Sequence, residues 1–181
     1  MINLRYYLIV SLNKGHHLSR METTELLAQY VAGHDMLKKQ LSVIPHSVIF
    51  FKPEKSWSIA EIIVHLADAE AMGFVCARKI IAESGGKVCV YNQQIWADKL
   101  HYGIMDHRDA LEHIRIIRKN LYKVLKLIPD KTWDNYIYHP EGGKLTLHDW
   151  LRSAVDHFQI HMEQMRQNYS LWQKAKDTVT V

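Results

Sequence analysis

The segment TLHDWLRSAVDHFQIH, from Thr146 to His161, decides the fold. It opens with Thr146 and, three residues later, Asp149, a variant of the capping box that marks the start of a helix. Inward-facing positions then recur every three or four residues, the spacing of an amphipathic helix. This stripe, which includes one histidine, consists of Leu147, Leu151, Ala154, Phe158, His161 and Met165. We therefore predict a helix that runs to about Tyr169 and buries one face.

Three further segments have the same periodicity and are also predicted to be helices. Pro45 ends the first of them and Pro129 the third, because proline cannot continue a helix. The second opens with a capping box formed by Ser58 and Glu61. In the third, one inward position is either Ile117 or Arg118. The three predicted helices cover residues 24–44, 58–84 and 108–127.

The connections between these helices indicate the architecture. The stretch from Gly85 to about Asp106 is too long for a tight turn and suits a crossover along a bundle. The segment from Trp133 to Lys144 is polar and aromatic, and we expect it to be a loop. With almost no strand signal, the fold class is all-α, a four-helix bundle with a long crossover between its second and third helices. Residues 1–20 are interpreted as an N-terminal extension of uncertain role, and residues 21–181 as the bundle domain.

Composition narrows the class of protein. The 181 residues are 48% hydrophobic and 23% charged, which suits one globular core. The net charge is +4, and the densest basic stretch is Arg115, Arg118, Lys119, Lys123 and Lys126. At helical spacing this stretch is interpreted as a solvated face, with a phosphate-binding strip as the alternative. We therefore expect no nucleic-acid partner.

Cysteine usage and hydropathy indicate the compartment. Cys76 and Cys89 form no Cys-x-x-Cys pair and are too few for a disulfide framework, which fits a reducing environment. No stretch approaches the ~20 apolar residues needed to span a bilayer, and the first residues lack the features of a secretory signal. We expect a cytoplasmic protein without a membrane partner.

Three of the 12 histidines differ from the rest by position. His157 and His161 lie four residues apart, so their side chains share one face, about 5–6 Å apart at Cβ. His65 occupies an inward position on the second helix, and if the second and fourth helices are antiparallel the three rings lie at a similar height. A buried ring without a partner costs about 1–3 kcal/mol. Two explanations remain open at this point: a shared metal ion, or three core histidines that each hydrogen-bond elsewhere.

Three stretches together resemble the DinB/YfiT-like family of proposed metalloenzymes, which are small four-helix bundles. They are Trp57-Ser-Ile-Ala-Glu-Ile-Ile-Val-His65, Tyr91-Asn-Gln-Gln-Ile-Trp96 and Leu147-His-Asp-Trp-Leu-Arg-Ser-Ala-Val-Asp-His157-Phe-Gln-Ile-His161. The likeness covers about residues 24–172, and the N-terminal extension departs from the family pattern. It implies an up-down-down-up bundle in which His65, His157 and His161 hold a divalent metal, usually nickel or zinc, with water in the open positions.

Other polar and aromatic residues are weaker candidates. His34 is a candidate fourth ligand, although the preferred interpretation is that it caps a polar gap in the core or is partly exposed. Asp68 is either a surface carboxylate or a residue that orients a ligand ring. His148 is expected to face solvent, and Trp96 to pack in the core or wall a pocket. His139 and Glu141 are candidates to overhang one end of the bundle.

These observations favour a metal-dependent enzyme. The resemblance implies a hydrolase or a transferase that joins low-molecular-weight thiols to electrophiles, so the expected partner is a small molecule, with a thiol as one candidate. A homodimer is one option for assembly. The alternatives are a non-catalytic metal-binding sensor or interaction module, and a metal-free bundle. No phosphate-binding loop, His-Glu-x-x-His motif or paired Glu-x-x-His di-iron motif is present.

Overall fold

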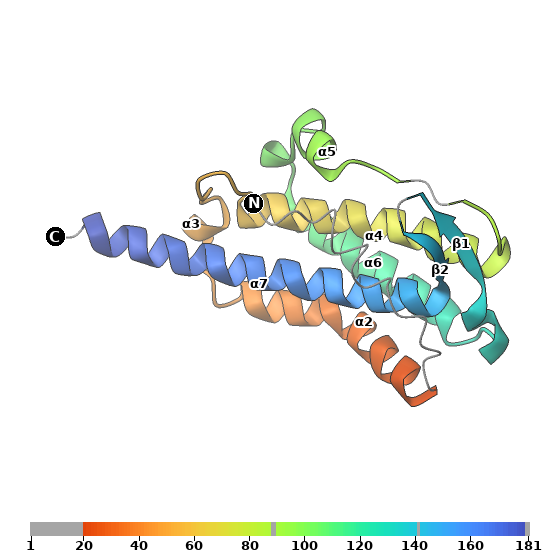
Figure 1. Cartoon of the computed structure of the whole chain (residues 1–181). Coiled ribbons are helices and arrows are strands. Elements are labelled where there is room, and N and C mark those ends of the chain that lie inside the picture. Colours follow the sequence, from red (N-terminus) through yellow and green to blue (C-terminus); the bar gives the residue numbers. More distant parts are fainter. Residues whose placement is uncertain (1–19, 88–89, 141, 180–181) are drawn as a thin grey trace.

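The computed structural model describes residues 20–87, 90–140 and 142–179. Four long helices form the bundle and enclose its core (Figure 1). A short crossover helix and a two-stranded hairpin are added to it. The elements are α2 (Arg20–Leu41), α3 (His46–Ile49), α4 (Ile59–Ala82), α5 (Gln93–Lys99), η2 (Tyr102–Ile104), α6 (His107–Leu125), η3 (Asp130–Asp134), β1 (Tyr136–His139), β2 (Gly143–Thr146) and α7 (Leu147–Val179). The four predicted helices and the long crossover are confirmed, but α7 continues to Val179, beyond its predicted end at about Tyr169.

Both predicted capping boxes form. At the start of α4, Ser58 Oγ accepts from the backbone N–H of Glu61 at 3.2 Å, and Glu61 Oε2 accepts from the backbone N–H of Ser58 at 2.7 Å. At the start of α7, Thr146 Oγ1 accepts from the N–H of Asp149, whose carboxylate accepts from the N–H of Thr146 at 3.0 Å. Each box satisfies backbone donors that the first helical turn leaves unpaired.

Cross-helix contacts fix how α4 and α7 face each other. Asn168, in the second half of α7, donates to the carbonyl of Trp57, just before α4 begins. At the other end, the ring of Trp150 lies beside Gly73, nearer the end of α4. The two helices are therefore antiparallel. The crossover that carries α5 and η2 lies along the outside of α4 in Figure 1.

The prediction of a loop from Trp133 to Lys144 is wrong, because this segment contains a β-hairpin. β1 and β2 are antiparallel, with Ile137 opposite Leu145, and both of these side chains are buried against the bundle. Each strand is only four residues long, so its alternation of buried and outward residues is too short to be distinguished from an irregular aromatic segment.

Arg118 is also placed differently from the prediction, which assigned it to a solvated basic face. Its side chain is fully buried: Nη2 donates to Glu70 Oε1 at 2.6 Å and Nη1 donates to the carbonyl of Tyr30 at 2.7 Å. Tyr30 in turn donates its hydroxyl to Glu70 at 3.2 Å. The inward position that was predicted to be either Ile117 or Arg118 is therefore occupied by Arg118. The ion pair with Glu70 compensates for its burial.

Two aromatic rings and a glycine make room for this guanidinium. Arg118 Cζ lies 3.8 Å from the ring centroid of Phe158 and 4.5 Å from that of Tyr30. A Cβ atom at Gly33 would overlap the guanidinium. The close approach of Arg118 from α6 thus requires glycine at position 33 in the predicted stripe of α2. The charge of Arg118 lies between two apolar parts of the core.

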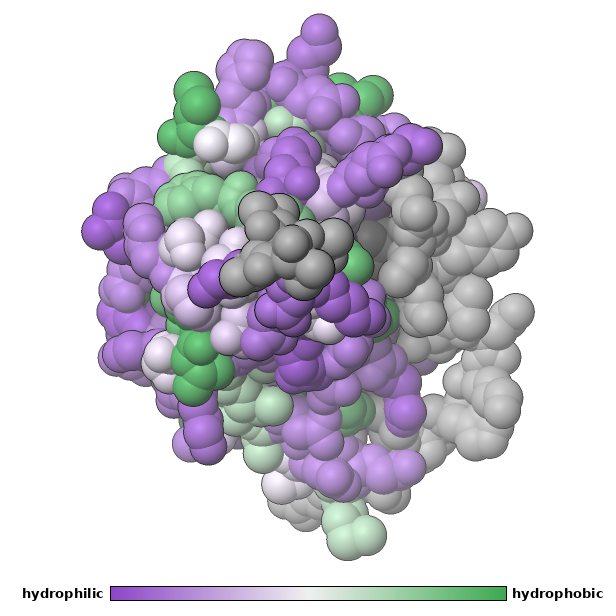
Figure 2. Space-filling view, turned by 90° about the vertical axis from the view of Figure 1, so that its left-hand side faces the viewer, coloured by the Kyte–Doolittle hydropathy of each residue, from purple (hydrophilic) through white to green (hydrophobic). Residues whose placement is uncertain are grey.

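The surface at the end of the bundle where α7 finishes is mainly hydrophilic. Figure 2 shows hydrophobic side chains there as separate patches among polar ones. Across the described residues, none of the helices combines the length and apolar character that crossing a membrane requires.

Candidate metal centre

The fold brings the three predicted histidines together. His65 lies in the second turn of α4, and His157 and His161 lie one turn apart in the first half of α7. Because α4 and α7 are antiparallel neighbours, the rings meet between them. The ring centroids are separated by 4.7 Å for His65 and His161, 5.3 Å for His65 and His157, and 4.6 Å for His157 and His161.

The distances between ring nitrogens suit a shared ion. One nitrogen from each ring lies within 4.8 Å of the other two, and the Nε2 atoms of His65 and His157 are 3.3 Å apart. Two nitrogens bound to one tetrahedral zinc at 2.0–2.1 Å lie about 3.3–3.4 Å from each other. The nearest pair therefore already has the spacing of two metal ligands.

The hydrogen bonds of the rings leave buried nitrogen atoms unpaired. His161 Nδ1 donates to Gln164 Oε1 at 2.9 Å, so its Nε2 carries the lone pair. That Nε2 and His65 Nδ1 are buried without a hydrogen-bond partner among the described residues. An unpaired buried polar atom is costly. An ion at His161 Nε2 would remove this cost for His161, which favours a shared ion over three separately hydrogen-bonded core histidines.

The environment keeps the rings neutral, which is the form that binds metal. Burial is the main cause that lowers the pKa of all three histidines, and for His65 the nearby His161 lowers it further. The pKa of His157 is lowered additionally by His161, His65 and Arg118. The pKa of His161 is lowered to about 4, although its hydrogen bond to Gln164 acts in the opposite direction.

These lowered pKa values predict that the metal-free protein becomes less stable as the pH decreases. Below the ordinary histidine pKa of about 6.5 the unfolded chain takes up protons that the folded chain does not. The free energy of unfolding should therefore fall as the pH decreases below about 6.5, and for His161 the fall continues to its pKa of about 4. Each excess proton contributes about 1.4 kcal/mol per pH unit.

Urea unfolding of the metal-free protein between pH 8 and pH 5 measures this dependence. His161→Gln should reduce the slope, because one of the three buried titrating rings is gone. His113→Ala, which changes an exposed histidine, should leave the slope unchanged. A stability that does not vary with pH over this range would contradict the assignment of neutral buried rings.

Aromatic side chains cover one side of the cluster. The ring of Trp57 lies 4.9 Å from that of His65 and 6.3 Å from that of Tyr102, which the crossover contributes. Tyr102 donates its hydroxyl to Asp68 at 2.5 Å. Burial, and then this bond to Asp68, raises the pKa of Tyr102. Asp68 therefore fixes the crossover on α4 and has no hydrogen bond to a ligand ring, in contrast to one predicted role.

The remaining histidine candidates lie elsewhere. His34 Nδ1 is 3.0 Å from Asp35 Oδ1, and His34 is not part of the cluster of three. The prediction that His148 faces solvent is wrong, because its side chain is buried. It hydrogen-bonds Thr23 through Nε2 at 2.9 Å and stacks on Trp133 with centroids 5.1 Å apart.

The hairpin lies at the end of the bundle opposite to the three clustered histidines. His139 Nδ1 accepts from the backbone of Gly142, and Asn135, next to the hairpin, donates to the carbonyl of Ile80. Ile80 follows His65 by 15 residues, about 22 Å along a helix. His139 is therefore far from the cluster, and Glu141 lies outside the described residues.

Trp96, another candidate, is half-buried against the core. Its ring packs on that of Tyr91 at an inclined angle, with centroids 4.4 Å apart.

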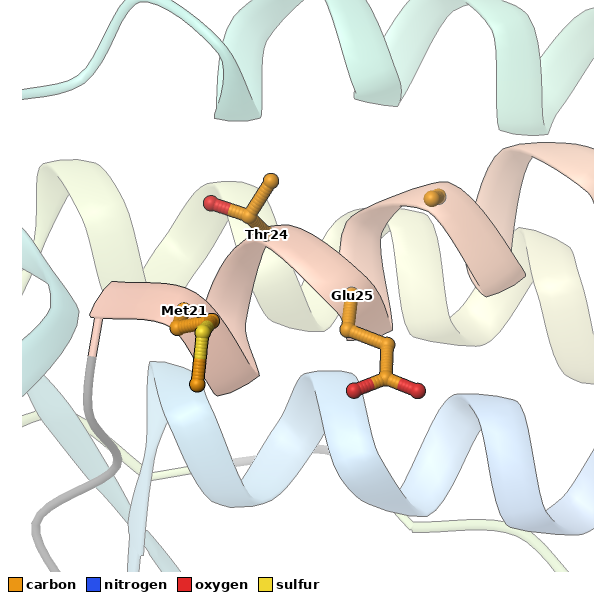
Figure 3. Close-up of a pocket in the computed structure, with 4 residues that line it drawn as sticks. Met21, Thr24 and Glu25 are labelled. Atoms are coloured by element: carbon orange, nitrogen blue, oxygen red, sulfur yellow. The ribbon is translucent and has the colours of Figure 1, made fainter.

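A separate surface recess lies at the start of α2. Met21, Thr24, Glu25 and Ala28 line it, and Met21 and Glu25 extend toward α7 (Figure 3). None of the three clustered histidines lines this recess. Access to the histidines is instead suggested by His157, which is only half-buried, whereas His65 and His161 are buried.

Sequence reasoning missed two residues beside the cluster. Gln164 accepts from His161, and Trp57 packs on His65, although the sequence only marked Trp57 as part of a family-like segment. The spacing of three residues between His161 and Gln164 was an available signal, because such residues are neighbours on a helix. Glutamines at this spacing are common on solvated faces, so the signal alone was not specific.

Comparisons with known proteins agree with this fold. A sequence model of the DinB superfamily matches residues 16–165. No curated protein matches the chain by sequence. YfiT from Bacillus subtilis, described as a probable metal-dependent hydrolase with an unusual four-helix bundle topology, superposes with a TM-score of 0.81 at 16% identity, covering 88% of this chain and 93% of its own.

A second solved structure is more distant. The mycothiol-dependent maleylpyruvate isomerase superposes with a TM-score of 0.64 at 12% identity, covering 79% of this chain and 60% of its own. At these identities both likenesses concern the fold.

Proposed function

The chain belongs to the DinB superfamily, and from that premise we propose that it is a metal-dependent enzyme in which His65, His157 and His161 bind one divalent ion. The observation that carries the proposal is the set of three neutral imidazoles, two buried and one half-buried, whose nitrogens converge within 4.8 Å. Neutral imidazole suits nickel and zinc, among other transition metals.

Three protein ligands leave the coordination of such an ion incomplete, as is typical of catalytic rather than structural zinc. When bound, the ion would supply Lewis acidity, which lowers the pKa of water toward about 7 or holds a thiol as thiolate. The chain contributes the neutral ligands, and the ring of Trp57 excludes water from one side of His65. Because His157 is the one half-buried ligand, we propose that a small molecule approaches the ion from its side.

The reaction we propose is hydrolysis, or the transfer of a low-molecular-weight thiol to an electrophile. YfiT is described as a probable metal-dependent hydrolase, and the isomerase as mycothiol-dependent. Both descriptions support chemistry in which an activated oxygen or sulfur nucleophile attacks a small molecule. Turnover of paired thiols and electrophiles, compared with hydrolysis of simple esters and amides, distinguishes the two reactions.

An open coordination position is the property that separates an enzyme from a structural metal protein. We expect the visible spectrum of the cobalt-substituted protein to change when azide, cyanide or a small thiol is added. Ligands of this kind should replace water on the ion without displacing a histidine. A titration followed by absorbance, with cobalt content measured before and after, tests this.

A cobalt spectrum that ignores all three added ligands would contradict the enzyme proposal. It would indicate a closed site and favour the alternative, a non-catalytic metal-binding module. The control is the same titration on free cobalt in the buffer, which identifies any change that arises off the protein.

A further inference from the structure

We propose that Gln164 is a positioning residue for the metal centre, which selects the tautomer of His161 and holds its ring in the orientation that binds metal. This inference rests on the proposed metal-dependent function. It concerns a residue that touches a ligand rather than the ion. Four observations support it, each independent of the identity of the metal.

The first observation is the direction of the hydrogen bond. The amide oxygen of Gln164 faces His161 Nδ1 at 2.9 Å, so the ring nitrogen donates. A neutral imidazole has one N–H and one lone pair. Because the N–H is on Nδ1, the lone pair lies on Nε2, which is buried and has no partner among the described residues. Gln164 thereby directs the free lone pair of His161 into the cluster.

The second observation is that this support is unequal among the three ligands. Among the residues that the structure describes, the rings of His65 and His157 are hydrogen-bonded only to each other, through their Nε2 atoms at 3.3 Å. Within residues 20–87, 90–140 and 142–179, His161 is the only ligand ring that is hydrogen-bonded to a side chain outside the trio. Partners of this kind fix ring orientation and raise ligand basicity. His161 is therefore the ligand whose ring orientation is fixed before the metal binds.

The third observation is that Gln164 is itself held in place. Its amide nitrogen donates to Ser56 Oγ at 3.4 Å, in the turn that leads into α4. One helical turn further along α7, Asn168 donates to the carbonyl of Trp57 at 2.8 Å. Residues 161, 164 and 168 therefore form a polar stripe on α7 that faces the start of α4.

The fourth observation is that the same turn supports the opposite ligand. The ring of Trp57, next to Ser56, lies 4.9 Å from the ring of His65. The turn from Ser56 to Trp57 thus contacts His65 directly and His161 through Gln164. One turn therefore contacts both helices that carry ligands, and Gln164 links it to His161.

Metal affinity measured on the full-length protein tests the proposal. Gln164→Leu should weaken binding of Zn²⁺ and Co²⁺ by about 10–100-fold, the range found when partners of ligand rings are removed. It should also change the visible spectrum of bound Co²⁺. Gln164→Glu should restore at least the wild-type affinity, because a carboxylate can only accept the N–H of His161. Competition with a chelator gives the affinities.

Two comparisons separate positioning from a merely structural role. Metal-free Gln164→Leu should unfold at the same urea concentration as the metal-free wild type. Gln173→Leu, the same change at an exposed position of α7, should leave affinity and spectrum unchanged. The proposal is overturned if Gln164→Leu binds within threefold of the wild type with the same cobalt spectrum, or if Gln164→Glu fails to rescue it. A wild type that binds neither ion would instead refute the proposed function.

Discussion

Alanine at either His157 or His161 is expected to abolish metal binding. The purified wild-type protein should carry close to one divalent ion per chain, and each variant should carry almost none after dialysis. The reason is geometric: the cluster offers three nitrogens within 4.8 Å of one another, and no further histidine, cysteine or carboxylate of the described residues belongs to this group. Removing one nitrogen leaves two ligands, too few to retain the ion.

Metal content measured by elemental analysis tests this directly, and thermal unfolding provides a second measurement. An ion that binds only the folded chain stabilises it by about 4 kcal/mol when its concentration exceeds the dissociation constant 1,000-fold. A chelator should therefore lower the melting temperature of the wild type but not that of either variant. The same result is expected for activity, if the ion is catalytic.

The matched control is His113→Ala, which removes an exposed histidine from α6. It should retain both the ion and the response to chelator. If His157→Ala and His161→Ala also retain a full ion, the metal site proposed here is wrong. Retention in only one of the two would reduce the ligand set to His65 and the remaining histidine of α7.

Glu70→Ala is expected to destabilise the protein strongly. Glu70 is the charged partner of the buried Arg118, with 2.6 Å between Oε1 and Nη2, and both side chains are almost fully buried. Removing one partner of a buried pair leaves an uncompensated charge and costs about 3–5 kcal/mol. For a protein of this size that corresponds to a decrease in melting temperature of about 6–20 °C.

Arg118 has little freedom to relieve this loss by moving. Its other nitrogen, Nη1, is fixed by the carbonyl of Tyr30 at 2.7 Å, and its guanidinium is stacked at 3.8 Å on Phe158. Tyr30 would also lose the acceptor of its hydroxyl. Chemical denaturation at neutral pH measures the change. Glu70→Gln, which retains an acceptor but not the charge, should lie between the wild type and Glu70→Ala.

Glu163→Ala is the matched control, since Glu163 pairs with Arg166 at 2.7 Å on the surface of α7. Surface pairs contribute little to stability, so this variant should unfold almost as the wild type does. Equal stabilities of Glu70→Ala and Glu163→Ala would show that the buried pair does not hold α4 and α6 together.

Much of the fold could be predicted from the sequence because its signals are local. A capping box such as Ser58 and Glu61 involves residues three positions apart, and an apolar stripe depends only on helical periodicity. The pairing of His157 with His161 is equally local, since residues four apart share a face whatever surrounds them. The role of His65 needed more: its meeting with the pair depends on α4 and α7 being antiparallel, which the family resemblance implied.

Local patterns failed where the structure of a segment depends on contacts with other segments. The hairpin was missed because two strands of four residues are stabilised by pairing with each other and by burial of Ile137 and Leu145, not by their own propensity. His148 was expected in solvent because a first-turn histidine usually is there. Its burial depends on Thr23 and Trp133, which other elements supply.

Taken alone, the sequence determined the four helices, their capping boxes and the shared face of His157 and His161. The tertiary structure decided that Arg118 is buried and that Gln164, rather than Asp68, contacts a ligand ring. The physical reason is that burying a charge or choosing a tautomer is favourable only when a complementary group is within hydrogen-bonding distance. For Arg118 that group is Glu70, 48 positions away in the chain, and only the packing of α4 against α6 brings the two together.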